Sequence, residues 1–508
     1  MFDVLLHMSP NMPLIAPLIA PLNAPLNAPL KAPQERARRR LVRLVLLIYV
    51  VVIFEGALRK WLLPEFSQVL FFLRDPFLLY AYVLATRHRL WPRRSAWLSL
   101  AWGMAALGVL LVFLQAASGG VSDTRWLLGA YGWRGYFMAL PLAWLVGAQF
   151  NPADLWRLVR LTLWLTLPVA VLVAVQFSSP MDAAINVGSA SDTDLQFRGV
   201  GLNVERTRPM GPFASGAGQQ QFVAAAFALL LAACITPAAR RRAGVLLLAL
   251  SACALLACAA FSGSRGTVLQ CALSAAFALG LVALGRGAAL KARALAWPLG
   301  MAVAAVVLVP VLFPAGFAAF LERWTSASAA EANFTGGVLG RALFGLVDFT
   351  RLIDDVPALG YGLGYGGNAS ITLGARIDGV MPGKLAETDF ARHMVDLGPV
   401  FGLGYIVFRV ALTCWLAARV WRATRQSASA LPMLLFSYAG YVLLLGQITG
   451  QGTINSYGWL FVGLCIAATR APLRQAVPAR RRTPGPLYPH RLHTPYPMPA
   501  LAGTARPG

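Results

Sequence analysis

Three arginines stand beside glycine or proline in polar stretches between long apolar segments. They are Arg208 in Arg208-Pro-Met-Gly211, Arg265 in Ser262-Gly-Ser-Arg-Gly266, and Arg341, which follows Gly340. A guanidinium group can bind a phosphate through two parallel hydrogen bonds, so arginines in such turns are suited to binding an anionic substrate. The alternative is that each arginine only reaches from the lipid interface to water. Three of them in similar settings favour the anionic substrate.

A second group of ionisable residues follows further along the chain. Glu387, Asp389, Arg392, His393 and Asp396 stand at near-helical spacing. Glu387 or His393 is the candidate general base, able to take the proton of a sugar hydroxyl that attacks an anomeric carbon. The alternative is a solvated amphipathic helix that leads into the next apolar segment.

The segment Gly360-Tyr-Gly-Leu-Gly-Tyr-Gly-Gly367 precedes this group and is rich in glycine. No strand–helix unit surrounds it, so it is not a dinucleotide-binding fingerprint. Its backbone allows either the close approach of a ligand or a sharp re-entrant turn.

Composition defines the class of protein that must position these residues. The chain has 508 residues, of which 58% are hydrophobic. A soluble protein has no interior large enough for so much apolar side chain, so the sequence predicts an all-α, polytopic transmembrane bundle. The formal net charge is +24. The basic residues fall mainly in short loops between apolar runs, which is the positive-inside pattern and argues against a nucleic-acid partner.

Twelve apolar segments are predicted to cross the membrane. One lies between Gln221 and Arg240, and the others are 41–57, 66–86, 96–116, 127–148, 158–177, 244–261, 267–285, 297–314, 397–418, 431–449 and 457–470. The transmembrane domain is therefore 41–470. Residues 1–40, with a repeated Ala-Pro-Leu pattern and then a basic cluster, and residues 471–508, rich in Pro and Arg, are predicted to be disordered cytoplasmic tails.

The arginine-rich short loops all fall on one side of this arrangement. With both termini in the cytoplasm, the sequence predicts outward-facing loops at 178–216, 262–266 and 315–396, in a bacterial inner membrane. The loop 315–396 is the large periplasmic loop. Arg74 and Asp75 lie inside a predicted span and are expected to have separate partners, because neighbouring residues do not face each other on a helix. The alternative is structural packing around a proline kink. Arg134 lies inside another predicted span.

No metal or cofactor site is expected from the sequence. The cysteines lack metal-ligand spacing and lie in apolar segments, where they are expected to pack as small core residues. They are Cys234, Cys253, Cys258, Cys271, Cys414 and Cys465.

The order of these motifs resembles the O-antigen ligase and O-antigen polymerase family of bacterial inner-membrane proteins. The resemblance covers about residues 200–410. The matching motifs are Arg208-Pro-Met-Gly-Pro-Phe213, Phe261-Ser-Gly-Ser-Arg-Gly-Thr267, Gly340-Arg341, Pro357-Ala-Leu-Gly-Tyr-Gly-Leu-Gly364 and Glu387 to Gly398.

The resemblance implies metal-independent glycosyl transfer from a polyprenyl-pyrophosphate-linked glycan to a glycan or lipid-linked acceptor, alone or with other glycan-assembly proteins. Arg265, Arg341 and, more loosely, Arg208 match the arginines that hold pyrophosphate. In ligases of the family a histidine opens the last motif, whereas here Glu387 stands at that position and His393 follows it. This departure favours a polysaccharide polymerase over a ligase.

Two other functions remain open from the sequence. One is a transporter or flippase for an anionic lipid or solute, which Arg74, Asp75 and Arg134 support to some degree. The other is a catalytically idle scaffold in a glycan-assembly complex.

Overall fold

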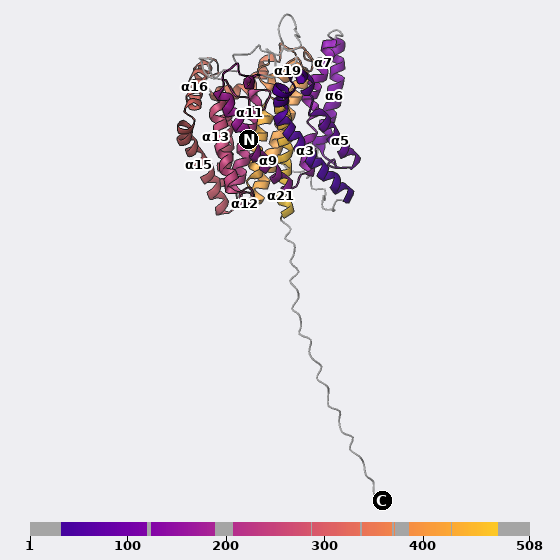
Figure 1. The fold of residues 1–508 in the computed structure, drawn as a ribbon. Coiled ribbons are helices and arrows are strands. Elements are labelled where there is room, and N and C mark those ends of the chain that lie inside the picture. The colour runs from indigo at the N-terminus through magenta and orange to yellow at the C-terminus, as the bar shows by residue number, and fades with distance from the viewer. Residues whose placement is uncertain are drawn as a thin grey trace. The chain divides into compact units, whose positions relative to one another are not determined.

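The computed structural model describes residues 32–118, 123–187, 207–285, 287–335, 338–367, 370, 386–427, 429–475 and 508. Within these residues the chain is helical and contains no β-strand (Figure 1). The chain divides into two units, 1–472 and 473–508, and the packing described below is that of the first unit.

The first half of the chain is helical in its described residues from Ala32 to Asn186, apart from short connecting turns. The helices are α3 (Ala32–Ala57), η1 (Leu58–Leu62), η2 (Pro64–Phe66), α4 (Ser67–Leu70), α5 (Asp75–Arg87), α6 (Ala96–Ser118), α7 (Asp123–Trp133), η3 (Arg134–Met138), α8 (Leu142–Gln149), α9 (Pro152–Ser178) and η4 (Ala184–Asn186). The second half contains α11 (Gly216–Ile235), α12 (Pro237–Ala243), α13 (Val245–Ser262), α14 (Arg265–Leu284), α15 (Ala288–Leu312), α16 (Pro314–Thr335), α17 (Val338–Val347), η5 (Asp348–Leu352), α19 (Asp389–Gln426), α20 (Leu431–Leu445) and α21 (Gly452–Gln475).

Among the described residues, nine helical segments are long and apolar enough to cross a membrane. A multi-span helical membrane protein is therefore supported. Each of the twelve predicted spans coincides with helix, but three of them fall outside the nine. The predicted span 127–148 is broken by the π-helix η3 and a turn before Pro141, 431–449 contains only the short helix α20, and 457–470 lies within α21.

The predicted boundaries at two places were wrong. Residues 32–40, expected in the disordered N-terminal tail, belong to α3, and residues 471–475, expected in the C-terminal tail, belong to α21. The basic start of α3 is held by ion pairs, because Arg38 binds Glu35 at 2.9 Å and Asp154 of α9 at 2.6 Å.

The predicted outward segment 315–396 is more regular than a loop. Its described part contains α16, α17 and η5, and it ends in the first turns of α19. Residues 371–385 lie outside the described residues.

Helix α11 is the packing centre of the bundle. It contacts α9, α13, α14, α15 and α20. Within its most apolar window, 89% of the residues are buried in protein, whereas the figure for α15 is 6%. Runs of alanine allow neighbouring helices to approach α11 closely. The apolar surface of α15 is left for lipid.

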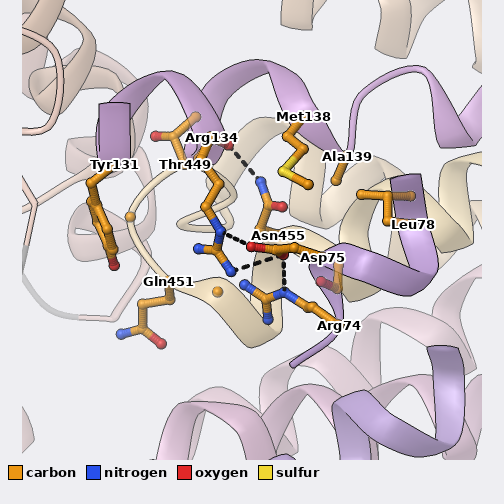
Figure 2. Close-up of a pocket in the computed structure, with 14 residues that line it drawn as sticks. Arg74, Asp75, Leu78, Tyr131, Arg134, Met138, Ala139, Thr449, Gln451 and Asn455 are labelled. Atoms are coloured by element: carbon orange, nitrogen blue, oxygen red, sulfur yellow. Dashed lines mark hydrogen bonds and ion pairs between the residues drawn. The ribbon is translucent and has the colours of Figure 1, made fainter. Parts of the chain in front are cut away.

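The charges inside the second predicted span form a shared network rather than fully separate pairs, because Arg74 also lies 3.8 Å from Asp75 (Figure 2). Arg134 binds both carboxylate oxygens of Asp75, at 2.5 and 3.1 Å, while the nearest carboxylate to Arg74 is Glu55, at 3.6 Å. Asp75 and Pro76 open α5 after the turn that ends at Arg74, because proline fits the first turn of a helix. These pairs join α3, α5 and η3.

The glycine-rich segment is a re-entrant turn packed against a kink in α19. Gly398 at the kink has φ of 75°, and a Cβ there would lie 2.2 Å from the carbonyl oxygen of Ala358. Gly360 has φ of 73°, and its Cβ would lie 2.6 Å from the nitrogen of Gly398. The backbone that approaches these glycines is the protein's own.

Replacement of Gly398 by alanine is expected to lower the free energy of unfolding by about 2 kcal/mol or more, because a left-handed conformation and a backbone clash are both imposed on the side chain. Gly404→Ala is the matched control on the same helix, since nothing lies within 4 Å of its Cβ position. Thermal unfolding of the purified variants checks this difference, and equal midpoints would contradict the packing described.

Candidate functional site

Arg265 is the first residue of α14 and lies at the end of the bundle opposite a basic triplet. The triplet Arg240–Arg242 is in α12, at the other end of α13 from the turn before Arg265. α12 lies at the lower edge of the bundle in Figure 1. The turn is fixed by Ser264, whose side chain caps α14 by accepting from the Thr267 N–H and donates to Gln220 at 3.2 Å.

Arg208 lies in the segment that leads into α11, and neighbouring elements hold that segment. Lys60 donates to the carbonyl of Gly211 at 2.8 Å, and the N–H of Gly211 donates to Gln176 at 2.7 Å. The Arg208 guanidinium passes over Gly216, where a Cβ would lie 3.5 Å from its Nε. Arg208 is half-buried and has no hydrogen bond or ion pair with any described residue.

A third arginine, Arg323 of α16, connects Arg208 and Arg265 electrostatically. Burial and the charge of Arg323 lower the pKa of Arg208 to about 10. Burial and the charge of Arg265 likewise lower the pKa of Arg323. The positive charges of Arg208, Arg265 and Arg323 therefore act on one another, and we call these three residues the arginine cluster.

Packing of the surrounding helices explains how α16 reaches this place. α16 contacts α13, and the rings of Phe261 and Phe313 lie 5.2 Å apart at the α15–α16 junction. Sequence reasoning missed Arg323. Its signal was the charged pair Glu322-Arg323 between aromatic residues in an otherwise apolar helix.

Arg341, the third predicted pyrophosphate ligand, lies on α17. Its side chain is outside the described part of the chain. The structure thus brings two of the three predicted arginines into one electrostatic cluster and adds Arg323 to them.

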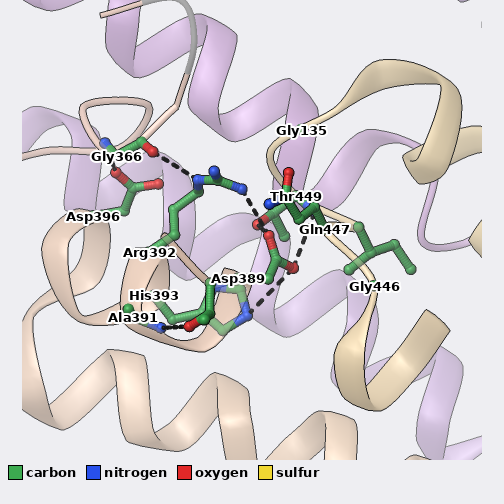
Figure 3. A network of polar contacts seen from close by, with 12 residues as sticks. Gly135, Gly366, Asp389, Ala391, Arg392, His393, Asp396, Gly446, Gln447 and Thr449 are labelled. Carbon is green, nitrogen blue, oxygen red and sulfur yellow. Dashed lines mark hydrogen bonds and ion pairs between the residues drawn. The ribbon is translucent and has the colours of Figure 1, made fainter. Parts of the chain in front are cut away.

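His393 is fully buried in a network of polar side chains on α19 (Figure 3). Its Nε2 is 2.8 Å from the Arg409 guanidinium, which can only donate, so Nε2 accepts. Its Nδ1 is 2.9 Å from the Tyr136 hydroxyl, and this hydroxyl donates to Asp396 at 3.1 Å. Nδ1–H is therefore the donor to Tyr136, and both ring nitrogens are engaged.

Asp389 is the anionic centre of the same network. It binds Arg409 at 2.5 Å, Arg392 at 2.9 Å and the hydroxyl of Thr449 at 2.8 Å. Arg409, also fully buried, donates to the last carbonyls of α20. This arrangement satisfies orphan carbonyls at a helix end and fastens α19 to α20.

Asp396 and Arg392 of α19 hold the glycine-rich turn through its residue Gly366. The Gly366 N–H donates to Asp396 at 2.6 Å, and Arg392 donates to the Gly366 carbonyl at 2.7 Å. Figure 3 shows Arg392 reaching from Gly366 to Asp389. Sequence reasoning named Asp389, Arg392, His393 and Asp396 but missed Arg409, whose signal was an arginine inside an apolar run.

Glu387 occupies a very different environment from His393. It is exposed, just before the N-terminal turn of α19, and the side chain of Gln447 donates to its carbonyl at 3.3 Å. Of the two candidate bases, Glu387 is exposed to solvent and His393 is fully buried within the network.

Within the described residues, no three His, Cys, Asp or Glu side chains gather as a metal site requires. Comparison of the chain with family models, curated proteins and solved structures finds no match.

Replacement of His393 by alanine is expected to cost about 2–4 kcal/mol of stability, because Arg409 and Tyr136 each lose a buried partner. Glu387→Gln is expected to change stability by less than about 0.5 kcal/mol, as an exposed side chain does. Thermal unfolding of both variants checks the contrast, and an unperturbed His393→Ala protein would contradict the network.

The pKa of Arg208 predicts the direction of a pH effect. Its ordinary value of 12.5 falls to about 10 in the folded protein, so the unfolded chain binds more protons between these values. Stability from this group therefore rises as the pH increases through about 10. Between about pH 9 and pH 11, the thermal unfolding midpoint of the wild type should rise relative to that of the Arg208→Gln variant. A relative fall would contradict the electrostatic account.

Proposed function

We propose that this protein transfers a glycan from a polyprenyl-pyrophosphate carrier to an acceptor hydroxyl on the periplasmic face of a bacterial inner membrane. A polysaccharide polymerase is favoured over a ligase. The observation that carries the proposal is the arginine cluster, in which side chains from three separate segments raise the positive potential at one end of the bundle.

The chemistry needs a site of this charge. The acceptor oxygen attacks the anomeric carbon while the bond from that carbon to the phosphate oxygen breaks. Polyprenyl pyrophosphate leaves with the electron pair, and fixed guanidinium groups stabilise the negative charge that develops on it. Arg208, Arg265 and Arg323 supply this stabilisation, with Arg341 as a fourth candidate.

The proton of the acceptor hydroxyl also needs a destination. Glu387 is the proposed general base, because it is exposed at the start of α19. His393 contributes by fixing Tyr136 and the first turns of α19, and no proton moves to it in this scheme.

The finer topology of the proposal has twelve crossings with both termini in the cytoplasm. The arginine cluster and Glu387 then share the outer side. This agrees with helix directions in the structure, because α19 ends in Arg419, Arg422 and Arg425, at the opposite end from Glu387.

Arg265→Ala is expected to lower transfer by about 10²–10³-fold while the protein stays in the membrane, because one preorganised donor to the leaving group is lost. Arg241→Ala is the matched control, since Arg241 is exposed at the opposite end of α13. The product is measured as polymer formed per amount of membrane-inserted protein.

The lipid that accumulates on deletion separates the reactions. Single repeat units on polyprenyl pyrophosphate mean a polymerase, and complete polymer on the lipid means a ligase. Full transfer by Arg265→Ala would overturn the role of the cluster, and unchanged glycolipids after deletion would overturn the function.

A further inference from the structure

A second group of arginines lies at and beside a pocket between α5, η3 and the start of α21 (Figure 2). The pocket is small, with a cavity volume of about 20 Å³, and it is partly open to solvent. Arg74, Tyr131, Arg134, Gln451, Gly452 and Asn455 are among its lining residues.

The positive charges around this pocket outnumber the carboxylates that pair with them. Arg59 and Arg74 share Glu55, at 3.3 and 3.6 Å, and Arg134 takes both oxygens of Asp75. Among the described residues, three guanidinium groups thus share two carboxylates, and two of the three, Arg74 and Arg134, line the pocket. A buried positive charge in excess is costly unless an anion compensates it.

Arg74 is the member of this set that makes no hydrogen bond within the described part of the chain. Only 6% of the residue is exposed. Its ion pairs with Glu55 and Asp75 are longer than a hydrogen bond, at 3.6 and 3.8 Å. The guanidinium therefore lines the pocket with donors that a ligand oxygen can take.

The chain opposite Arg74 is a glycine turn that opens a long helix. A Cβ at Gly452 would lie 2.5 Å from Arg74 Nη2, and one at Gly450 would lie 1.6 Å from Arg392 Nη1. Asn455 fixes the turn by donating to the carbonyls of Gly135 and Ile448, at 2.6 and 2.8 Å. The first N–H groups of a helix lack partners within it and attract anions.

We propose that this pocket binds a phosphate group. Phosphate matches the excess charge, the donors of Arg74 and the helix start of α21. The pocket lies beyond the C-terminal end of α20, which is the end of the bundle away from Arg419–Arg425. At this end of the bundle, the phosphate group can belong either to a lipid headgroup or to free phosphate. This inference stands on the pocket alone and does not require glycosyl transfer.

The test uses the full-length protein with Arg265→Ala, so that the arginine cluster contributes less to anion binding. Thermal unfolding is followed with inorganic phosphate against chloride at equal ionic strength, and in nanodiscs of phosphatidic acid against phosphatidylcholine. We expect phosphate, phosphatidic acid or both to raise the midpoint. An effect of phosphate alone identifies a free ligand, and an effect of phosphatidic acid alone identifies a lipid headgroup.

Gln451→Glu in the same background places a carboxylate in the pocket. It should raise the midpoint of the ligand-free protein and weaken phosphate binding at least about tenfold, since the excess charge is then compensated internally. Gln447→Glu is the matched control in the same turn, outside the pocket lining, and should retain phosphate binding.

A second variant keeps the test decisive if Gln451→Glu does not fold. Gly452→Ala displaces the end of Arg74 and should weaken phosphate binding several-fold. The proposal is overturned if neither phosphate source raises the midpoint, or if Gln451→Glu or Gly452→Ala binds phosphate as tightly as Gln447→Glu.

Discussion

The carboxylate of Asp389 holds together the end of the bundle at which α19 begins. It pairs with Arg409 and Arg392 and accepts from Thr449, so one buried anion connects α19, the end of α20 and the turn before α21. Removing one member of a buried ion pair typically costs about 3–5 kcal/mol, because the other charge stays behind without a partner. The positions of Glu387 and of the Gly450–Gly452 turn both follow from this anion.

The same end of the bundle uses arginine in two different ways. The N–H groups of Arg392 and Arg409 donate to carboxylates and backbone carbonyls, so these two side chains have a structural role. Arg208 has no such partner among the described residues, and burial together with the charge of Arg323 lowers its pKa. A positive group that no described residue neutralises is suited to an anionic ligand, and Arg208 is the member of the arginine cluster with this property.

Much of the helical architecture could be predicted, because a helix that crosses a membrane needs a long apolar run and such runs can be recognised in the sequence. The shorter contacts of Asp75 with Arg134 and of Arg74 with Glu55 agree with the divergence of adjacent residues on a helix, but the 3.8 Å pair between Arg74 and Asp75 was not predicted. The start of α3 at Ala32 was not, because its charged turn depends on Asp154, far away in the sequence. The broken span at η3 likewise depends on tertiary contacts of Arg134 and Tyr136.

The candidate site was predictable only in part, for the same reason. Arg208 and Arg265 stood out beside glycine, but their connection through Arg323 requires α16 to fold back onto α13. His393 and Glu387 looked equivalent as bases in the sequence. Burial separates them, because the Tyr136 and Arg409 partners of His393 come from distant segments.

The most direct test of the account is a reconstituted reaction. The purified protein in lipid nanodiscs is given a synthetic polyprenyl-pyrophosphate oligosaccharide and an acceptor glycan, and released polyprenyl pyrophosphate is counted against new glycosidic bonds. Glycosyl transfer predicts one pyrophosphate lipid released per bond formed. Movement of the intact glycolipid across a vesicle membrane without bond formation, or no reaction at all, would contradict the account.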